Sequence, residues 1–284
     1  MDEHNLKVFI ICTHSVVGAL PLGILVTSDE TTNTLASAFE MYKSCLPDYA
    51  FYGRGEKGPL VFMTDNCPEL RDALKSNWPE ATLLLCLFHI LQQVWRWLCD
   101  GKNLIDKEDR QGLMNSFKGL AYDLHQDSFE LKYQKMIQAE DTESVASEGS
   151  DEEDAVSSYP QFLNYIKDVM ELKESWALCF RTELMLRGHN TNNNAEAQFL
   201  VIKDKILQRI KEYNVVSLMQ KLVVDFQDHY KDKLLSVASG SYDSFTARRF
   251  DGKSKRKGEL GYKVNVSSIC KCTPGILIME SLRA

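Results

Sequence analysis

Two acidic residues far apart in the sequence have the chemistry to share a metal ion. Asp65 follows an apolar run, residues 60–63, that predicts a strand buried on both faces. Glu196 follows an Asn-rich stretch and opens an amphipathic helix. Carboxylate oxygens bind hard divalent cations, and two cations about 3.5–4 Å apart stabilise both the attacking and the leaving oxygen of a phosphoryl transfer. In the simpler alternative, Asp65 caps a turn and Glu196 complements a helix dipole.

Two cysteine motifs are spaced for metal binding. Cys86 and His89 form a C-x-x-H motif, but a structural zinc site takes four ligands and no second pair stands near them in the sequence. A buried Cys beside a hydrogen-bonded His is the alternative that we favour. Cys270 and Cys272 form a C-x-C motif with no later Cys or His, so they supply only half of a tetrahedral site.

The elements around Asp65 predict where it lies. The pattern of residues 60–98 reads strand, helix, strand, helix, with Pro68 in the first turn of the first helix and Pro79 after its end. Two strands joined in this way are parallel neighbours with a right-handed crossover. Ligands of such sheets bind at the carboxyl ends of the strands, where Asp65, Cys86 and His89 are expected.

The rest of the chain adds a hairpin and a set of helices. Residues 6–14 and 22–27 predict two antiparallel strands, with residues 17–21 as the turn between them. A helix over residues 29–46, capped by Ser28 or Asp29, should follow. A glycine-rich loop, residues 52–58, is interpreted as a flexible connector. Further helices are predicted over residues 106–124, 128–139, 160–180, 195–209 and 215–235.

Composition limits the class of protein. The 284 residues, 44% of them hydrophobic, suffice for one good core and a smaller appendage. The net charge of −7 arises largely from residues 140–154, which hold eight acidic and no basic residues. The composition of this stretch predicts a disordered linker. The apolar runs are too short to span a membrane and no signal peptide opens the chain, so we expect an intracellular protein with reduced thiols.

Several separated motifs together resemble one family. The stretches THSVVGALPLGILVTSDE, FYGRG, VFMTDN and WPEATLLLCLFHILQQVWRWL resemble the catalytic domain of Mutator-like (MULE) transposases, closest to the animal members that continue into a SWIM zinc motif. RGHNTNNNAEAQFLVIKDKILQR resembles the segment that carries the last acidic residue of that family. The resemblance implies an α/β fold: a ribonuclease-H-like mixed sheet with flanking helices that lacks the first strand and carries a large helical insertion.

The resemblance assigns roles to the residues above. Asp65 matches the second Asp of the DDE triad and Glu196 its Glu, so both would hold Mg²⁺ or Mn²⁺, with Cys86 and His89 supporting the site. The family's first Asp precedes the strand that starts at Leu6, and we therefore expect this chain to lack DDE strand-transfer activity. Cys270 and Cys272 match the first half of the SWIM motif, which would bind Zn²⁺ only in a full-length form.

The resemblance also implies a nuclear protein with DNA, both transposon ends and target, as its partner. No membrane partner is expected, and self-association into a homo-oligomer stays open. The candidate DNA contacts surround the Asn-rich stretch, where basic side chains neutralise phosphates without reading sequence. They are Arg187, Asn192, Asn193, Lys203, Lys205 and Arg209.

The predicted organisation has four parts. Residues 1–101 form the first part of the core and residues 102–185 the helical insertion, with the acidic linker at about 140–158. Residues 186–238 return to the core with Glu196, and residues 239–284 form a basic linker and an incomplete SWIM-like zinc motif. The leading function is that of a transposase-derived protein. A domesticated nucleic-acid- or protein-binding module without catalysis is the alternative, and a ribonuclease-H-like nuclease is the third.

Overall fold

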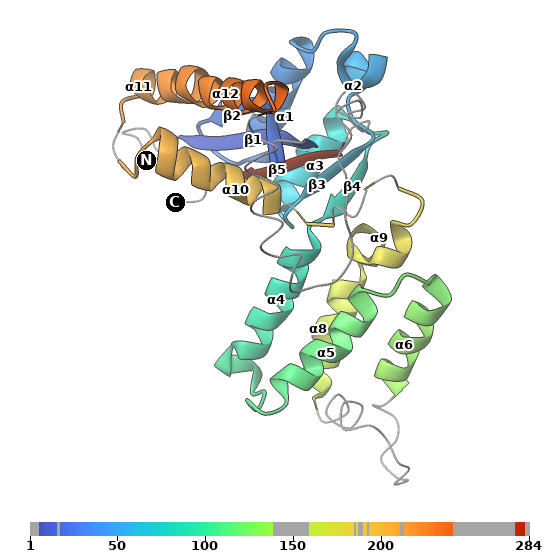
Figure 1. Ribbon diagram of the computed structural model, residues 1–284. Coiled ribbons are helices and arrows are strands. Elements are labelled where there is room, and N and C mark those ends of the chain that lie inside the picture. Colours follow the sequence, from blue (N-terminus) through green and yellow to red (C-terminus); the bar gives the residue numbers. More distant parts are fainter. Residues whose placement is uncertain are drawn as a thin grey trace. The chain divides into compact units, whose positions relative to one another are not determined.

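A mixed α/β architecture is seen in the computed structural model of the protein (Figure 1). It describes residues 6–15, 18–138, 159–184, 186, 190–191, 193–210, 213–240 and 276–281. The chain divides into two compact units. The first unit comprises residues 1–62, 68–82 and 193–284, and the second comprises residues 63–67 and 83–192. The acidic linker, the basic stretch around residues 248–257 and the C-x-C motif lie outside the described residues.

Five strands form one sheet in the order β2-β1-β5-β3-β4. Their bounds are Lys7–Ser15 for β1, Gly18–Thr27 for β2, Val61–Thr64 for β3, Thr82–Leu85 for β4 and Ile276–Ser281 for β5. β1 pairs antiparallel with β2 and with β5. The strands β3 and β4 were predicted as parallel neighbours. Thr82 N–H donates to Leu60 C=O (2.9 Å) and Cys86 N–H to Thr64 C=O (2.8 Å). The partners advance in the same direction along both strands, which confirms the parallel pair.

The hairpin of β1 and β2 is longer than predicted. Residues 18–21, expected as part of the turn, belong to β2, and the register shifts by one residue between Ile11 and Cys12. Pro21 lies within the strand because β2 is an edge of the sheet, where a missing backbone N–H costs no ladder hydrogen bond. The turn predicted at residues 17–21 is wrong for residues 18–21, because Pro21 suits an edge strand as well as a turn.

The helices of the first unit pack around the strands. They are α1 (Thr32–Ser44), α2 (Ala50–Gly53), η1 (Gly55–Lys57), α3 (Pro68–Asn77), α10 (Asn193–Val201), η4 (Ile202–Ile206), α11 (Val215–Gln220), η5 (Lys221–Asp225) and α12 (Phe226–Ala238). η4 and η5 are π-helical turns that continue α10 and α11. The cap of α1 is Thr31, not Ser28 or Asp29, because the Asp29 carboxylate binds the N–H and hydroxyl of Thr31 instead. Figure 1 shows α10 beside β1 and β5, and α10 contacts both strands and β2.

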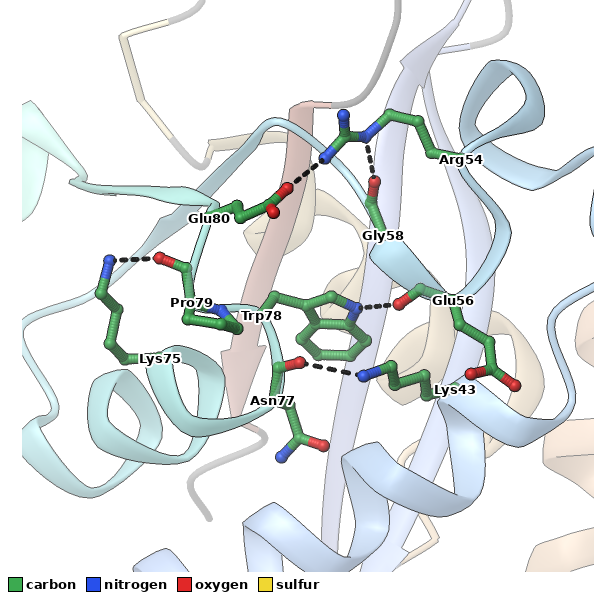
Figure 2. A network of polar contacts seen from close by, with 9 residues as sticks. All are labelled: Lys43, Arg54, Glu56, Gly58, Lys75, Asn77, Trp78, Pro79 and Glu80. Atoms are coloured by element: carbon green, nitrogen blue, oxygen red, sulfur yellow. Dashed lines mark hydrogen bonds and ion pairs between the residues drawn. The ribbon is translucent and has the colours of Figure 1, made fainter.

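Trp78 fills the space between α1 and β3. Its ring lies 5.7 Å from that of Phe39 and 5.1 Å from that of Phe62, measured between centroids. Its indole N–H donates to the Glu56 carbonyl at 3.1 Å, as Figure 2 shows. The aromatic core of this unit therefore also fixes the glycine-rich loop.

Hydrogen bonds and an ion pair hold the loop of residues 52–58, so the prediction of a flexible connector is wrong. Arg54 Nε donates to the Gly58 carbonyl at 2.8 Å, and the same guanidinium lies 3.8 Å from Glu80 (Figure 2). Gly58 has a φ of +68°, and a Cβ atom there would meet Trp78 Nε1 at 2.3 Å. Only glycine satisfies both the backbone angle and the close approach of the indole.

The second unit is a helical bundle. Its helices are α4 (Leu87–Cys99), η2 (Gly101–Asn103), α5 (Arg110–Ala121), α6 (Gln126–Gln138), α8 (Pro160–Met170), α9 (Lys173–Trp176) and η3 (Leu178–Phe180). Trp176 is fully buried, donates its indole N–H to Val169 C=O (3.0 Å) and packs against Phe117. The predicted insertion, residues 102–185, falls within this unit, which also contains α4. None of the helices in the described ranges is long and apolar enough to cross a membrane.

Candidate functional site

Asp65 stands at the carboxyl end of β3. The four residues of β3 are buried, and Asp65, the next residue, is half-buried. Thr64 Oγ1 donates to the Asp65 carbonyl at 2.9 Å, and the Thr64 carbonyl accepts the N–H of Cys86. The turn that carries Asp65 is therefore bonded to the end of β4.

Cys86 and His89 lie at the N-terminus of α4. Cys86 is fully buried in the position before the helix, and its carbonyl accepts the N–H of Ile90 at 3.2 Å. His89 is in the first turn, half-buried, with its ring 5.7 Å from that of Phe88. Both residues thus lie where β4 ends, in the same unit as Asp65.

Arg181 is a buried cation beside this strand end that sequence reasoning missed. Its side chain is 3% exposed, and its guanidinium donates to the carbonyls of Leu85 (2.5 Å), Ser175 (2.8 Å) and Asn190 (3.4 Å). Burial lowers the pKa of Arg181 to about 10. The Asn190 carbonyl also accepts the N–H of Leu87, the first residue of α4. Arg181 therefore joins the end of β4, α9 and the segment around residue 190 at the start of α4.

Glu196 occupies the first turn of α10, as predicted. It is half-buried, and the helix is anchored by Ala195 and Phe199, which are buried. Two residues after Glu196, Gln198 is 4% exposed and donates from Nε2 to the Ala19 carbonyl of β2 at 3.0 Å. Its Oε1 accepts the hydroxyl of Tyr230 on α12. These two bonds fix the helix that carries Glu196 to β2 and to α12.

The candidate DNA contacts are partly described. Lys203 and Lys205 lie on η4, and Lys205 is exposed. The predicted helix over residues 195–209 ends at Ile206, and Arg209 beyond it has a φ of +58° and forms an ion pair with Asp204 (Nε to Oδ1, 2.9 Å). Asn193 is the first residue of α10, while Arg187 and Asn192 fall outside the described residues.

The predicted metal ligands are distributed over the two units. Asp65, Cys86 and His89 belong to the second unit and Glu196 to the first. Among the described residues, no group of three or more His, Cys, Asp or Glu side chains is arranged to hold a metal ion. Carboxylates are the ligand type that Mg²⁺ and Mn²⁺ prefer, so the chemistry of Asp65 and Glu196 suits these ions. The shared metal site and the zinc ligation by Cys270 and Cys272 stay predictions.

A known protein family matches the part of the chain that contains Asp65. Residues 2–93 match the MULE transposase domain. The MULE match runs from β1 into α4 and includes Asp65, Cys86 and His89, and it ends before Arg181 and Glu196. It covers less than half of the chain, and it supports the resemblance on which the roles of these residues were predicted.

A similar curated protein is the PKS-NRPS hybrid synthetase cheA of Chaetomium globosum. It is 21% identical over an alignment of 251 residues, and the alignment covers 85% of this chain and 5% of that protein. The chain therefore spans only a small part of the length of this relative. The similarity extends beyond the MULE match into the helical unit and the α10 region.

Proposed function

We propose that this protein is a transposase-derived DNA-binding protein with a ribonuclease-H-like sheet. The observation that carries the proposal is the MULE match over residues 2–93, which contains a carboxylate, Asp65, directly after a buried strand. The mixed sheet flanked by helices is compatible with this fold. From the same resemblance we infer that DNA is the partner and that the protein acts in the nucleus.

In this proposal Asp65 and Glu196 hold Mg²⁺ or Mn²⁺. Such an ion neutralises charge on a phosphodiester and lowers the pKa of a bound water. The chain's own residues position the carboxylates. The bonds of Thr64 and Cys86 hold the Asp65 turn, and Gln198 holds the first turns of α10. Cys86 and His89 support the site from the start of α4.

DNA contact in this proposal is made through phosphates. Lys203 and Lys205 project from η4, which continues the Glu196 helix, and Arg209 follows it. Ammonium and guanidinium groups bind backbone phosphates without reading bases, so affinity should fall as salt rises. Sequence-independent binding is the expected behaviour.

The test is a nicking and binding assay on supercoiled and linear duplex DNA, with Mg²⁺, with Mn²⁺ and with chelator. We expect the parent protein to bind DNA with little or no nicking. Any metal-dependent nicking that it does show should fall roughly 100-fold or more in Asp65→Asn and in Glu196→Gln, since removal of even an outer-shell partner costs 10–100-fold. Asp72→Asn, an exposed carboxylate on α3, is the matched control and should nick like the parent protein.

The outcomes separate the candidate functions. Nicking lost in both variants and kept in the control supports a DDE-type enzyme. Binding that survives both substitutions, without nicking in any sample, supports the binding module without catalysis. A parent protein that neither binds nor nicks duplex DNA refutes the proposed function.

A further inference from the structure

An apolar groove lies between the strand β2 and the helix α12 of the first unit (Figure 1). Its volume is about 730 Å³. One wall consists of residues 20–24 of β2. The other wall consists of residues on η5 and α12, which are Leu222, Val223, Phe226, Gln227, Tyr230, Lys231, Leu234, Leu235 and Ala238. We call this feature the β2–α12 groove.

The apolar side chains of the β2–α12 groove are open to solvent. The exposed fractions are 40% for Leu22, 53% for Val223, 42% for Leu234 and 58% for Leu235. Single exposed apolar side chains are ordinary on a protein surface, whereas a contiguous patch marks an interaction site. A small-molecule site buries roughly 70–90% of its ligand, which a lining as exposed as this one does not achieve. The groove therefore suits a polypeptide.

The helix wall is shaped for a second helix. Its lining residues on α12 form two adjacent rows with a spacing of four residues. One row holds Phe226, Tyr230, Leu234 and Ala238, and the other holds Gln227, Lys231 and Leu235. Such rows are the ridges of a helix surface, and a partner helix packs its own ridge between them. From Phe226 to Ala238 the wall is roughly 18 Å long at 1.5 Å per residue, which matches about three turns of a partner helix.

The strand wall is a poor template for an added strand. Pro21 has no backbone N–H, and the register shift of the β1–β2 pair leaves Leu22 without an opposite residue on β1. The carbonyl of Ala19 already accepts the side chain of Gln198. A helix satisfies its own backbone hydrogen bonds, so it needs no ladder with this wall.

The charge of the groove selects the partner further. Of the described residues that line it, Lys231 is the one with a charged side chain. Lys231 is exposed, and no carboxylate of the described part of the chain lies within 4 Å of its Nζ. Two copies of the groove placed face to face would bring together two ammonium groups and no carboxylate. A partner that carries an acidic side chain is complementary, and a second copy of this face is not.

We propose that the β2–α12 groove binds an amphipathic helix of another protein, with apolar side chains at intervals of three and four residues and an acidic side chain opposite Lys231. The apolar side chains pack between the two rows of α12 and against Leu22, and they supply most of the affinity. The ion pair with Lys231 determines which helices bind. This inference does not depend on DNA binding, since it gives the chain a protein partner in addition to the nucleic acid of the proposed function.

The experiment uses fluorescently labelled synthetic peptides of about 16 residues, roughly 24 Å of helix, and follows their binding to the full chain by fluorescence anisotropy. The Glu peptide is amphipathic, with leucines on one face and a glutamate beside the middle of that face. The Lys peptide has lysine in place of this glutamate. The Pro peptide is the Glu peptide with two interior residues replaced by proline, which prevents a helix.

The parent protein should bind the Glu peptide about tenfold more tightly than the Lys peptide, since a favourable and an unfavourable exposed ion pair differ by that order. Lys231→Glu should invert this preference. Lys135→Glu, at an exposed position on α6 outside the groove, is the matched control and should keep it.

The apolar contact is tested with a second pair of variants. Leu235→Asp should weaken binding of the Glu peptide more than about fivefold, as loss of a central apolar contact does in an interface. Leu131→Asp on α6 is the matched control, because Leu131 is 60% exposed and lies outside the groove, and it should bind like the parent. Thermal unfolding of each variant establishes that it is folded.

The other occupants give different results. Equal binding of the Pro peptide would overturn the helical partner in favour of an extended one. A parent dimer in sedimentation equilibrium that Leu235→Asp dissociates, without peptide binding, would assign the groove to a second copy. Binding of a long-chain fatty acid that depends on Lys231, without peptide binding, would assign it to a lipid. A parent that binds none of the peptides, or a preference for the Glu peptide that Lys231→Glu leaves unchanged, overturns the inference.

Discussion

The hydroxyl of Tyr230 donates a hydrogen bond to Oε1 of Gln198, and both side chains are almost completely buried. Burial raises the pKa of the Tyr230 hydroxyl, which therefore stays protonated and acts as a donor at neutral pH. Since Gln198 also donates to Ala19, one side chain connects β2, α10 and α12. The stability of this unit should depend on the pair.

Tyr230→Phe should destabilise the protein by about 1–3 kcal/mol, because it leaves a buried amide oxygen without its donor. Urea unfolding followed by circular dichroism measures the change. Tyr122→Phe is the matched control, since Tyr122 is 54% exposed, and it should unfold like the parent within about 0.5 kcal/mol. Equal unfolding midpoints for Tyr230→Phe and the parent would contradict the role of the pair.

Arg181→Lys should cost about 1.5–3 kcal/mol, because an ammonium group cannot span the carbonyls of Leu85, Ser175 and Asn190 as the planar guanidinium does. Arg96→Lys, on the exposed face of α4, is the control and should change stability by less than about 0.5 kcal/mol. Both are compared by chemical denaturation. A lysine at position 181 that is as stable as arginine would show that the geometry of the guanidinium is unimportant there.

Gly58→Ala should destabilise the protein by about 2–5 kcal/mol, because the new methyl group combines a left-handed backbone with overlap on Trp78. Gly119→Ala in the last turn of α5 is the control with the opposite sign. A Cβ atom there meets nothing within 4 Å, so alanine should stabilise the helix by about 0.5–1 kcal/mol. Thermal unfolding distinguishes the two signs, and a stabilising Gly58→Ala would refute the packing of the loop.

The lowered pKa of His229 predicts how stability depends on pH. The unfolded chain takes up a proton at this side chain near its ordinary pKa of 6.5, and the folded protein does so only at lower pH. The contribution of His229 to stability is therefore fully present above pH 6.5 and is lost as the pH falls through the lowered value. His229→Gln should flatten the dependence of unfolding free energy on pH below 6.5. An unchanged slope in this variant would assign the effect to other groups.

Local sequence patterns predicted the elements that bury apolar residues on a regular period. The runs at residues 60–63 and 81–86 gave β3 and β4, and their parallel pairing was predicted from the connecting helix. The position of Glu196 in a first turn followed from the Asn-rich stretch before it. These features depend on neighbours within one or two turns, which a sequence displays directly.

Other features depend on partners far along the chain. Gln198 is three residues after Ala195 and four before Ile202, so it lies on the same helix face as these two buried residues. That spacing was the feature of the sequence that could have predicted the burial of Gln198. Arg181 gave no such sign, because its partners are backbone carbonyls up to 96 residues away. The place of β5 was also missed, since its pairing with β1 joins residues 9–12 to residues 278–281.

The middle place of β5 has a consequence for synthesis of the protein. β5 lies between β1 and β3, and its residues 276–281 are synthesised long after both of them, so these neighbours present open edges until β5 has left the ribosome. Without β5, the sheet of a nascent chain consists of two separate strand pairs, β1 with β2 and β3 with β4. Until residues 276–281 are available to pair, these open strand edges are exposed to chaperones and to aggregation.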